Sequence, residues 1–202
     1  KHVDTGMGLE RVVRAMSGKK SNYETDLFIP IINSICSITG KKYEGELIPV
    51  MNAIADHIRA LTFAISDGAM PSNEGRGYVL RRILRRALRL ARKLEFNEPF
   101  MYRLVDAVIE VFGDTFPEII EKIEYIKNVI MGEEISFNIT LDKGIEHFKE
   151  VYEKLKDNKD KVFPGEVAFK LYDTYGFPLD LTQVIAREHG FEVNIDKFNE
   201  EM

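Results

Sequence analysis

The sequence concentrates cationic side chains in one short segment, residues 76–93. This segment contains no acidic residue and holds Arg76, Arg81, Arg82, Arg85, Arg86, Arg89, Arg92 and Lys93. On a helix with roughly 100° per residue, the cations from position 81 onward fall within an arc of about 140°, and apolar residues fill the complementary arc. The spacing therefore predicts a helix with one buried face and one almost purely cationic face.

Phosphate groups are the natural partner for such a face. An ordinary solvated helix face mixes both signs of charge, whereas Arg81, Arg85 and Arg89 repel one another at a spacing of four residues, at a cost of a few tenths of a kcal/mol per pair. Arginine binds phosphate oxygens through two parallel hydrogen bonds, so a nucleic-acid backbone would offset this repulsion. Two alternatives stay open: acidic helices of the same protein neutralise the face, or the helix lies on a membrane surface.

The average charge of the chain conceals this asymmetry. The formal net charge is −5 at pH 7. Because residues 76–93 carry +8, the remaining residues together carry −13. A local excess of one sign indicates an anion-binding surface, even on a protein that is acidic as a whole.

A turn that contains an asparagine precedes the cationic segment. Residues 71–75 read Pro-Ser-Asn-Glu-Gly, a composition typical of turns. The amide of Asn73 offers a donor and an acceptor, and it can therefore read a base edge in a groove. From the residues alone, the commoner role of turn former or helix N-cap is favoured for Asn73.

A glycine-rich phrase, residues 4–11, is a second candidate site. Gly6 and Gly8 would let a ligand approach the backbone closely, and Arg11 is suited to hold a phosphate. The phrase is neither a P-loop nor a dinucleotide-binding fingerprint, because the Lys-Ser/Thr pair and the third glycine are missing.

Helices must position both candidate sites, because the pattern predicts an all-α fold, mainly a helical bundle, with a non-helical N-terminal segment. A short strand is expected over residues 3–7. The stretch 117–155 is long enough for one helix or for two that break near Gly132 or Gly144. The other helices are expected at about residues 9–16, 26–39, 49–66, 77 or 78 through the cationic segment, 100–112, 164–176 and 178–189, followed by a last helix capped by Asp196.

The composition is typical of a soluble globular protein. Of the 202 residues, 45% are hydrophobic and 30% are charged, and no apolar run reaches the length of about 18 residues that a membrane span needs. Four scattered histidines and the single Cys36 indicate no metal site, and the lone cysteine fits a reducing, cytoplasmic compartment. Since the sequence opens without Met and without a signal segment, we expect an interior piece of a longer protein.

Four phrases of the sequence occur together in one known family. They are Val3–Arg11, Ala55–Arg59, Met70–Arg82 and Leu171–Pro178. In this order they resemble the class II aminoacyl-tRNA synthetases in their alanine-specific form, and the first phrase is similar to motif 3 of that class. The resemblance spans essentially the whole chain, and the last two phrases are quite specific.

The resemblance implies a substrate-binding role for the first phrase. In class II enzymes the motif 3 arginine contacts the γ-phosphate of ATP and the glycines before it admit the adenylate, which implies ATP binding by Gly6, Gly8 and Arg11. In the alanine-specific form the aspartate of the motif holds the amino group of alanine, which implies that Asp4 and Gly6 bind alanine. ATP and Mg²⁺ are then cofactors of the full-length enzyme.

The resemblance also implies that Asn73 and Asp173 read the G·U wobble pair in the acceptor stem of tRNA(Ala). Such a pair leaves the exocyclic amine of guanine unpaired in the shallow RNA minor groove, where Asp supplies an acceptor and Asn an acceptor and a donor. By itself, Asp173 would be read as a helix-end acid. The arginine helix would follow the phosphates and give affinity without sequence information. The implied tRNA-binding residues are Asn73, Arg76, Arg81, Arg82, Arg85, Arg86, Arg89 and Asp173.

Two further groups of side chains in these phrases have structural roles as the favoured interpretation. We expect His57 to make a structural hydrogen bond near a helix interface rather than to catalyse. We expect Tyr172, Tyr175 and Phe177 to pack across a helix joint rather than to stack on an exposed base.

The same resemblance divides the chain at residue 45. It implies that residues 1–45 are the C-terminal remnant of a class II antiparallel-sheet catalytic domain and that residues 46–202 form a helical domain that recognises the acceptor stem. Motifs 1 and 2, and the zinc-site residues of the editing domain, are absent from the sequence, so we expect this piece alone to have no catalytic residue, to bind no cofactor and to be inactive. The competing functions are a helical module that binds nucleic acid without specificity and a docking site for an acidic protein.

Overall fold

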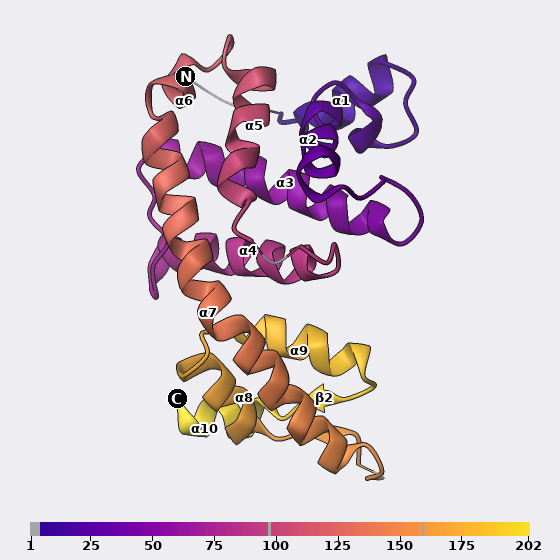
Figure 1. Ribbon diagram of the computed structural model, residues 1–202, viewed down its shortest axis with the longest axis vertical. Coiled ribbons are helices and arrows are strands. Elements are labelled where there is room, and N and C mark those ends of the chain that lie inside the picture. Colours follow the sequence, from indigo (N-terminus) through magenta and orange to yellow (C-terminus); the bar gives the residue numbers. More distant parts are fainter. Residues whose placement is uncertain (1–4, 97, 159) are drawn as a thin grey trace. The chain divides into compact units, whose positions relative to one another are not determined.

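The computed structural model describes residues 5–96, 98–158 and 160–202, and most of these residues are helical (Figure 1). The mainly helical fold predicted from the sequence is thereby confirmed. The chain divides into two compact units, Lys1–Gly132 and Glu133–Met202. No helix in the described part of the chain is both long enough and apolar enough to cross a membrane.

The first unit is assembled from helices that surround a central, 20-residue helix. Its elements are α1 (Leu9–Met16), η1 (Asn22–Glu24), α2 (Ile29–Thr39), α3 (Leu47–Ser66), α4 (Gly75–Arg92), η2 (Met101–Leu104), α5 (Val105–Phe112), α6 (Pro117–Glu121) and α7 (Ile123–Leu155) as far as Gly132. Helices α2, α4 and α5 all pack against α3 (Figure 1). Met51, Ile54, Ile58 and Leu61 of α3 are fully buried, because they recur at helical spacing on the faces that meet these neighbours.

Local sequence signals set several of these boundaries. The helix predicted over residues 26–39 ends at Thr39 as expected, because Gly40 adopts a φ of 70° that closes the helix in the left-handed region. At the other end α2 begins at Ile29, three residues later than predicted, with Pro30 in its first turn. The expected strand over residues 3–7 is wrong where it is described, since residues 5–7 have no regular structure.

The stretch 117–155 breaks at neither glycine. Helix α6 ends at Glu121, Lys122 departs from helical geometry with φ −106° and ψ 12°, and α7 then runs for 33 residues. Gly132 and Gly144 both lie inside α7, where a glycine costs about 1 kcal/mol relative to alanine without ending the helix. The break at Lys122 coincides with a 2.6 Å hydrogen bond from its Nζ to the carbonyl of Ser66, the last residue of α3.

The second unit packs short helices around buried phenylalanines. Its elements are the remainder of α7, β1 (Val162–Phe163), α8 (Gly165–Asp173), α9 (Leu179–Glu188), β2 (Glu192–Val193) and α10 (Ile195–Glu201). Phe148 and Phe163 stack with ring centroids 4.6 Å apart. Gly144 is required here, because a Cβ at that position would lie 2.3 Å from the ring of Phe177.

Two features of the second unit differ from the prediction. Strands β1 and β2 pair in parallel, with Val162 opposite Glu192 and Phe163 opposite Val193, although no strand was predicted there. The last helix is capped by Asn194 and not by Asp196, because the Asn194 side chain accepts a 3.0 Å hydrogen bond from the backbone N–H of Lys197. Asp196 instead lies in the first turn, where a negative charge also favours the helix.

Candidate functional site

Helix α4 carries the cationic segment and packs one apolar stripe into the first unit. Its exposed cations are Arg76 and Arg86, and Lys93 follows the helix, whereas the other five cationic side chains of the segment are half-buried. The predicted complete separation of apolar and cationic faces is wrong on one side. Val79 is 43% exposed, because the stripe that contacts the core is narrower than the apolar arc of the sequence.

The turn before α4 folds back onto the first turn of the helix. Gly75 has a φ of 55°, in the left-handed region, and Gly77 is buried beneath the turn. A Cβ at Gly77 would lie 2.1 Å from the Ser72 hydroxyl and 2.2 Å from the carbonyl of Met70. Gly75 and Gly77 therefore allow the turn to approach the first turn of α4 closely. This approach brings Asn73 alongside the helix.

Asn73 is held by an arginine of the cationic segment. Of the two roles that the residues alone favoured, Asn73 lies in the turn before α4 but is not the N-cap, which is Glu74. Instead the Nη1 group of Arg81 donates a hydrogen bond to the Oδ1 atom of exposed Asn73. This contact brings two of the predicted tRNA-binding residues together and fixes the direction of the amide.

Replacing Gly77 by Ala is expected to destabilise the first unit by about 1–3 kcal/mol, because the added methyl group cannot fit beneath the turn. Gly132→Ala is the matched control, since it lies in α7 with no described atom within 4 Å of the added carbon and should gain about 0.5–1 kcal/mol. Urea unfolding followed by circular dichroism measures both changes. Equal stability of the two variants would contradict the close approach.

The N-terminal phrase brings two predicted ATP-binding residues into contact. Gly8 is the N-cap of α1, and its carbonyl accepts a 3.1 Å hydrogen bond from the backbone N–H of Arg11. A Cβ at Gly8 would lie 3.6 Å from Cδ of Arg11, so the arginine side chain folds over the glycine. Gly6 is exposed. Asp4, the predicted alanine-binding residue, lies outside the described residues.

Asp173 lies in the second unit, apart in sequence from the other predicted site residues. It is exposed and is the last residue of α8. The aromatic side chains around it pack as expected: Tyr172 contacts Phe198 with ring centroids 5.7 Å apart, and Phe177 is fully buried beside Phe137. The carboxylate of Asp173 is therefore exposed at the end of a helix whose neighbouring aromatic side chains are engaged in packing.

His57 of α3 is a titratable group beside the cationic helix. Burial lowers the pKa of His57 below its usual value of 6.5, the positive charge of Arg86 lowers it further, and Asp56 opposes both effects. The Nε2 atom is buried without a hydrogen-bond partner among the described residues, so the expected structural hydrogen bond is not made by this nitrogen. The neutral imidazole is the form that the folded chain favours.

The folded chain should accordingly lose stability on acidification below about pH 6.5. Because the pKa of His57 is lower in the folded than in the unfolded state, the unfolded state binds more protons, and the stability present above pH 6.5 is lost as the pH falls through the folded-state pKa. Urea unfolding of the wild type and of His57→Gln at pH 7.5 and pH 5.5 tests this. The wild type should lose more stability than the variant, and identical losses would contradict the assignment.

Among the described residues, no group of three or more His, Cys, Asp or Glu side chains is arranged to hold a metal ion. Sequence reasoning missed two contacts that shape the site, the approach of Ser72 to Gly77 and an ion pair between Glu10 and Arg59. The turn composition was a signal for the first. No local pattern predicts the ion pair, because Glu10 and Arg59 are far apart in the chain.

Comparison with known proteins gives a consistent family over the full length. The family model described as tRNA synthetases class II (A) matches residues 1–202. An alanine–tRNA ligase of Chlorobium chlorochromatii (strain CaD3) is 53% identical over 202 residues, which cover 98% of this chain and 23% of that protein. An alanine–tRNA ligase of Staphylococcus aureus (strain JH9) is 50% identical over 204 residues, covering 100% of this chain and 23% of the relative. The chain thus spans about a quarter of the length of these curated relatives.

Proposed function

This chain belongs to the class II tRNA synthetases (A), and we propose that it is the acceptor-stem recognition part of an alanine–tRNA ligase. Relatives at 50–53% identity that carry this name support the assignment. In the complete ligase, alanine is activated with ATP and transferred to tRNA(Ala). The partners of the complete enzyme are therefore tRNA(Ala), ATP and alanine.

The observation that carries this proposal is the cationic segment of α4 together with Asn73, which accepts a hydrogen bond from Arg81 of that segment. Seven arginines lie between Gly75 and Arg92 without an acidic residue among them. Such a helix follows phosphates, while Asn73, oriented by Arg81, offers its amide to a base edge. In this proposal, α4 supplies affinity and the turn before it supplies base reading.

Asp173 supplies the second base-reading group in this proposal. Its carboxylate is an acceptor suited to the guanine amine that a G·U pair leaves unpaired in the minor groove. Exposure at the end of α8 leaves it accessible to RNA. Arg76 and Arg86, which are exposed, and the half-buried Arg81, Arg82, Arg85 and Arg89 contribute the phosphate contacts.

The N-terminal phrase is proposed to bind ATP and alanine in the complete ligase. Gly8 has no side chain to obstruct an anion, and Arg11 folds over it, which suits a phosphate at this point. Gly6 and Asp4 would bind the alanine part of the adenylate. In the complete ligase the alanine carboxylate would attack the α-phosphorus of ATP, which forms alanyl-adenylate and releases pyrophosphate, with Mg²⁺ to balance the phosphate charge. The residues of this chain contribute positioning and charge, not a covalent nucleophile.

We further propose that residues 1–45 descend from a class II catalytic domain and that residues 46–202 form the acceptor-stem domain. The 202 residues contain neither motif 1 nor motif 2, so the chain by itself should give no ATP–pyrophosphate exchange above background and bind no cofactor. Exchange by the purified chain would overturn this part of the proposal.

Binding of the chain to an alanine acceptor-stem hairpin tests the proposal. Fluorescence anisotropy at low salt should give saturable binding that weakens as the salt concentration rises, because phosphate contacts release counterions. An absence of binding at low salt would favour the alternative in which an acidic protein docks on α4. Equal affinity for the hairpin and for an unrelated DNA duplex would favour the non-specific nucleic-acid-binding module.

A further inference from the structure

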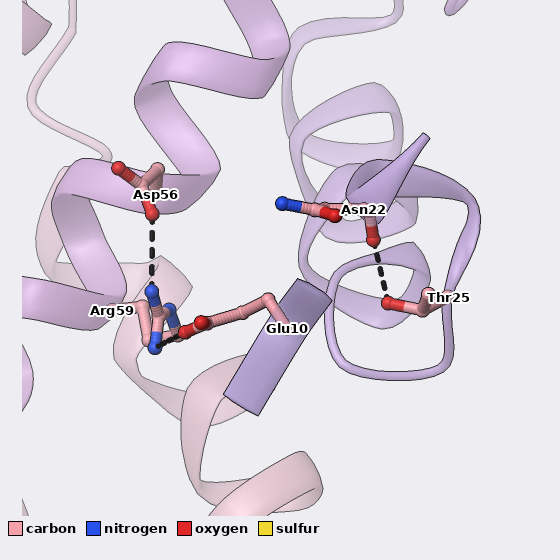
Figure 2. A network of polar contacts seen from close by, with 5 residues as sticks. All are labelled: Glu10, Asn22, Thr25, Asp56 and Arg59. Carbon is pink, nitrogen blue, oxygen red and sulfur yellow. Dashed lines mark hydrogen bonds and ion pairs between the residues drawn. The ribbon is translucent and has the colours of Figure 1, made fainter. Parts of the chain in front are cut away.

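Arg59 of α3 joins three separate elements of the first unit. Its Nη1 atom lies 2.7 Å from Oε1 of Glu10 on α1, and its Nη2 atom donates a 3.1 Å hydrogen bond to Oδ1 of Asp56 on α3. The guanidinium carbon also lies 5.2 Å from the ring centroid of Phe28, the N-cap residue of α2. Figure 2 shows the guanidinium between the two carboxylates.

The pair between Arg59 and Glu10 is better protected than an ordinary surface ion pair. Each of the two side chains is only 22% exposed, so water and salt screen their attraction less than they would at the surface. The Nε atom of Arg59 is buried as well. The Phe28 ring restricts the guanidinium further, and the bond of Nη2 to Asp56 holds Nη1 toward Glu10.

Helix α1 contacts η1, and the ion pair ties it in addition to the central helix α3. The helix has eight residues, none of them buried, and Leu9 and Met16 at its two ends are 54% and 84% exposed. A helix that contributes no buried side chain gains little orientation from the core. The ion pair therefore supplies a specific link from α1 to the central helix α3.

Glu10 immediately precedes Arg11, whose side chain folds over Gly8. Successive residues of a helix project about 100° apart, so a fixed direction for Glu10 also fixes the direction of Arg11. We propose that Arg59 is a positioning residue for ATP binding: through Glu10 it aims Arg11 and Gly8 at the nucleotide without touching it. This inference rests on the proposed function, in which Arg11 and Gly8 bind ATP.

The test uses the full-length ligase that carries this sequence, with ATP–pyrophosphate exchange as the assay. Arg59→Gln should raise KM for ATP roughly tenfold or more, because a displacement of about 1 Å at a binding group costs up to a hundredfold. KM for alanine should change much less. Arg59→Lys should restore part of the ATP affinity, because it keeps the charge opposite Glu10 but not the fork.

Two further variants isolate the pair. Glu10→Gln should reproduce the effect of Arg59→Gln, and the double variant should be no worse than either single change, because both remove the same contact. Arg14→Gln is the matched control, since it removes an exposed cation from the same helix and should leave KM for ATP unchanged. A merely structural Arg59 would lower the melting temperature and the active fraction while KM for ATP stayed at the wild-type value, and this result would overturn the inference.

Hydrogen exchange on the 202-residue chain separates this inference from the proposed function. Amides of α1 should exchange faster in Arg59→Gln than in the wild type or in Arg14→Gln. A wild-type ligase without pyrophosphate exchange would overturn the proposed function. Unchanged protection of α1 in Arg59→Gln would overturn the positioning role alone.

Discussion

Replacing Arg11 by Gln in the full-length ligase is expected to lower kcat/KM for ATP–pyrophosphate exchange by roughly a hundred- to a thousandfold, the usual effect of removing one donor from a developing negative charge. Arg11 is the only arginine in the phrase similar to motif 3, and it lies over a glycine that leaves room for an anion. Glutamine keeps much of the length of the side chain but removes the charge and the two-pronged phosphate contact.

The exchange assay should be run beside Arg14→Gln, which lies on the same helix one turn later and should remain within about twofold of the wild type. Circular dichroism of both variants checks that α1 and the core are retained. Arg11→Gln activity close to that of Arg14→Gln would contradict an ATP-binding role for the N-terminal phrase.

Replacing Asn73 or Asp173 by Ala is expected to reduce the preference for a G·U-containing hairpin over its G·C counterpart by roughly ten- to a hundredfold, because a good side-chain contact to a base edge is worth about 1–3 kcal/mol of discrimination. Affinity for the G·C hairpin should be mostly retained, since phosphate contacts carry it. Anisotropy titrations of each variant with both hairpins measure the two quantities separately.

Arg86→Gln is the control for these two variants, because Arg86 is exposed on α4 and is proposed to contact phosphate only. It should weaken binding to both hairpins equally and reduce the slope of log affinity against log salt concentration by about one. Arg81→Gln should have a mixed effect, since Arg81 holds the amide oxygen of Asn73. Wild-type discrimination in Asn73→Ala would remove this residue from the reading of the pair.

The sequence predicted those parts of the fold that depend on local signals. Helix α1 has the predicted bounds of residues 9–16, and the glycine stop at Gly40 is confirmed, because periodicity and capping act over a few residues. The start of α4 at Gly75, two or three residues earlier than the predicted 77 or 78, depends instead on a turn that packs against the helix it precedes. The parallel pair β1–β2 was missed because two-residue strands carry no usable period.

The candidate site, too, could be predicted only in part. The cationic arc of α4 and the glycine-rich phrase are visible as residue patterns, and the family resemblance supplied roles for them. The contact of Arg81 with Asn73, the ion pair of Arg59 with Glu10 and the burial of His57 beside Arg86 are not visible, because each depends on which helices meet. The partial exposure of Val79 has the same origin, since the width of the buried stripe is set by the neighbouring helix and not by α4 itself.

Whether this chain recognises the wobble pair is decided by its binding to an alanine acceptor-stem hairpin, measured beside the same hairpin with G·U changed to G·C. We expect tighter binding to the wobble-containing hairpin and a similar dependence on salt for both, because the phosphate contacts are shared and only the base contact differs. Equal affinity for the two hairpins would contradict recognition of the wobble pair by this chain and would leave α4 as a general phosphate-binding helix.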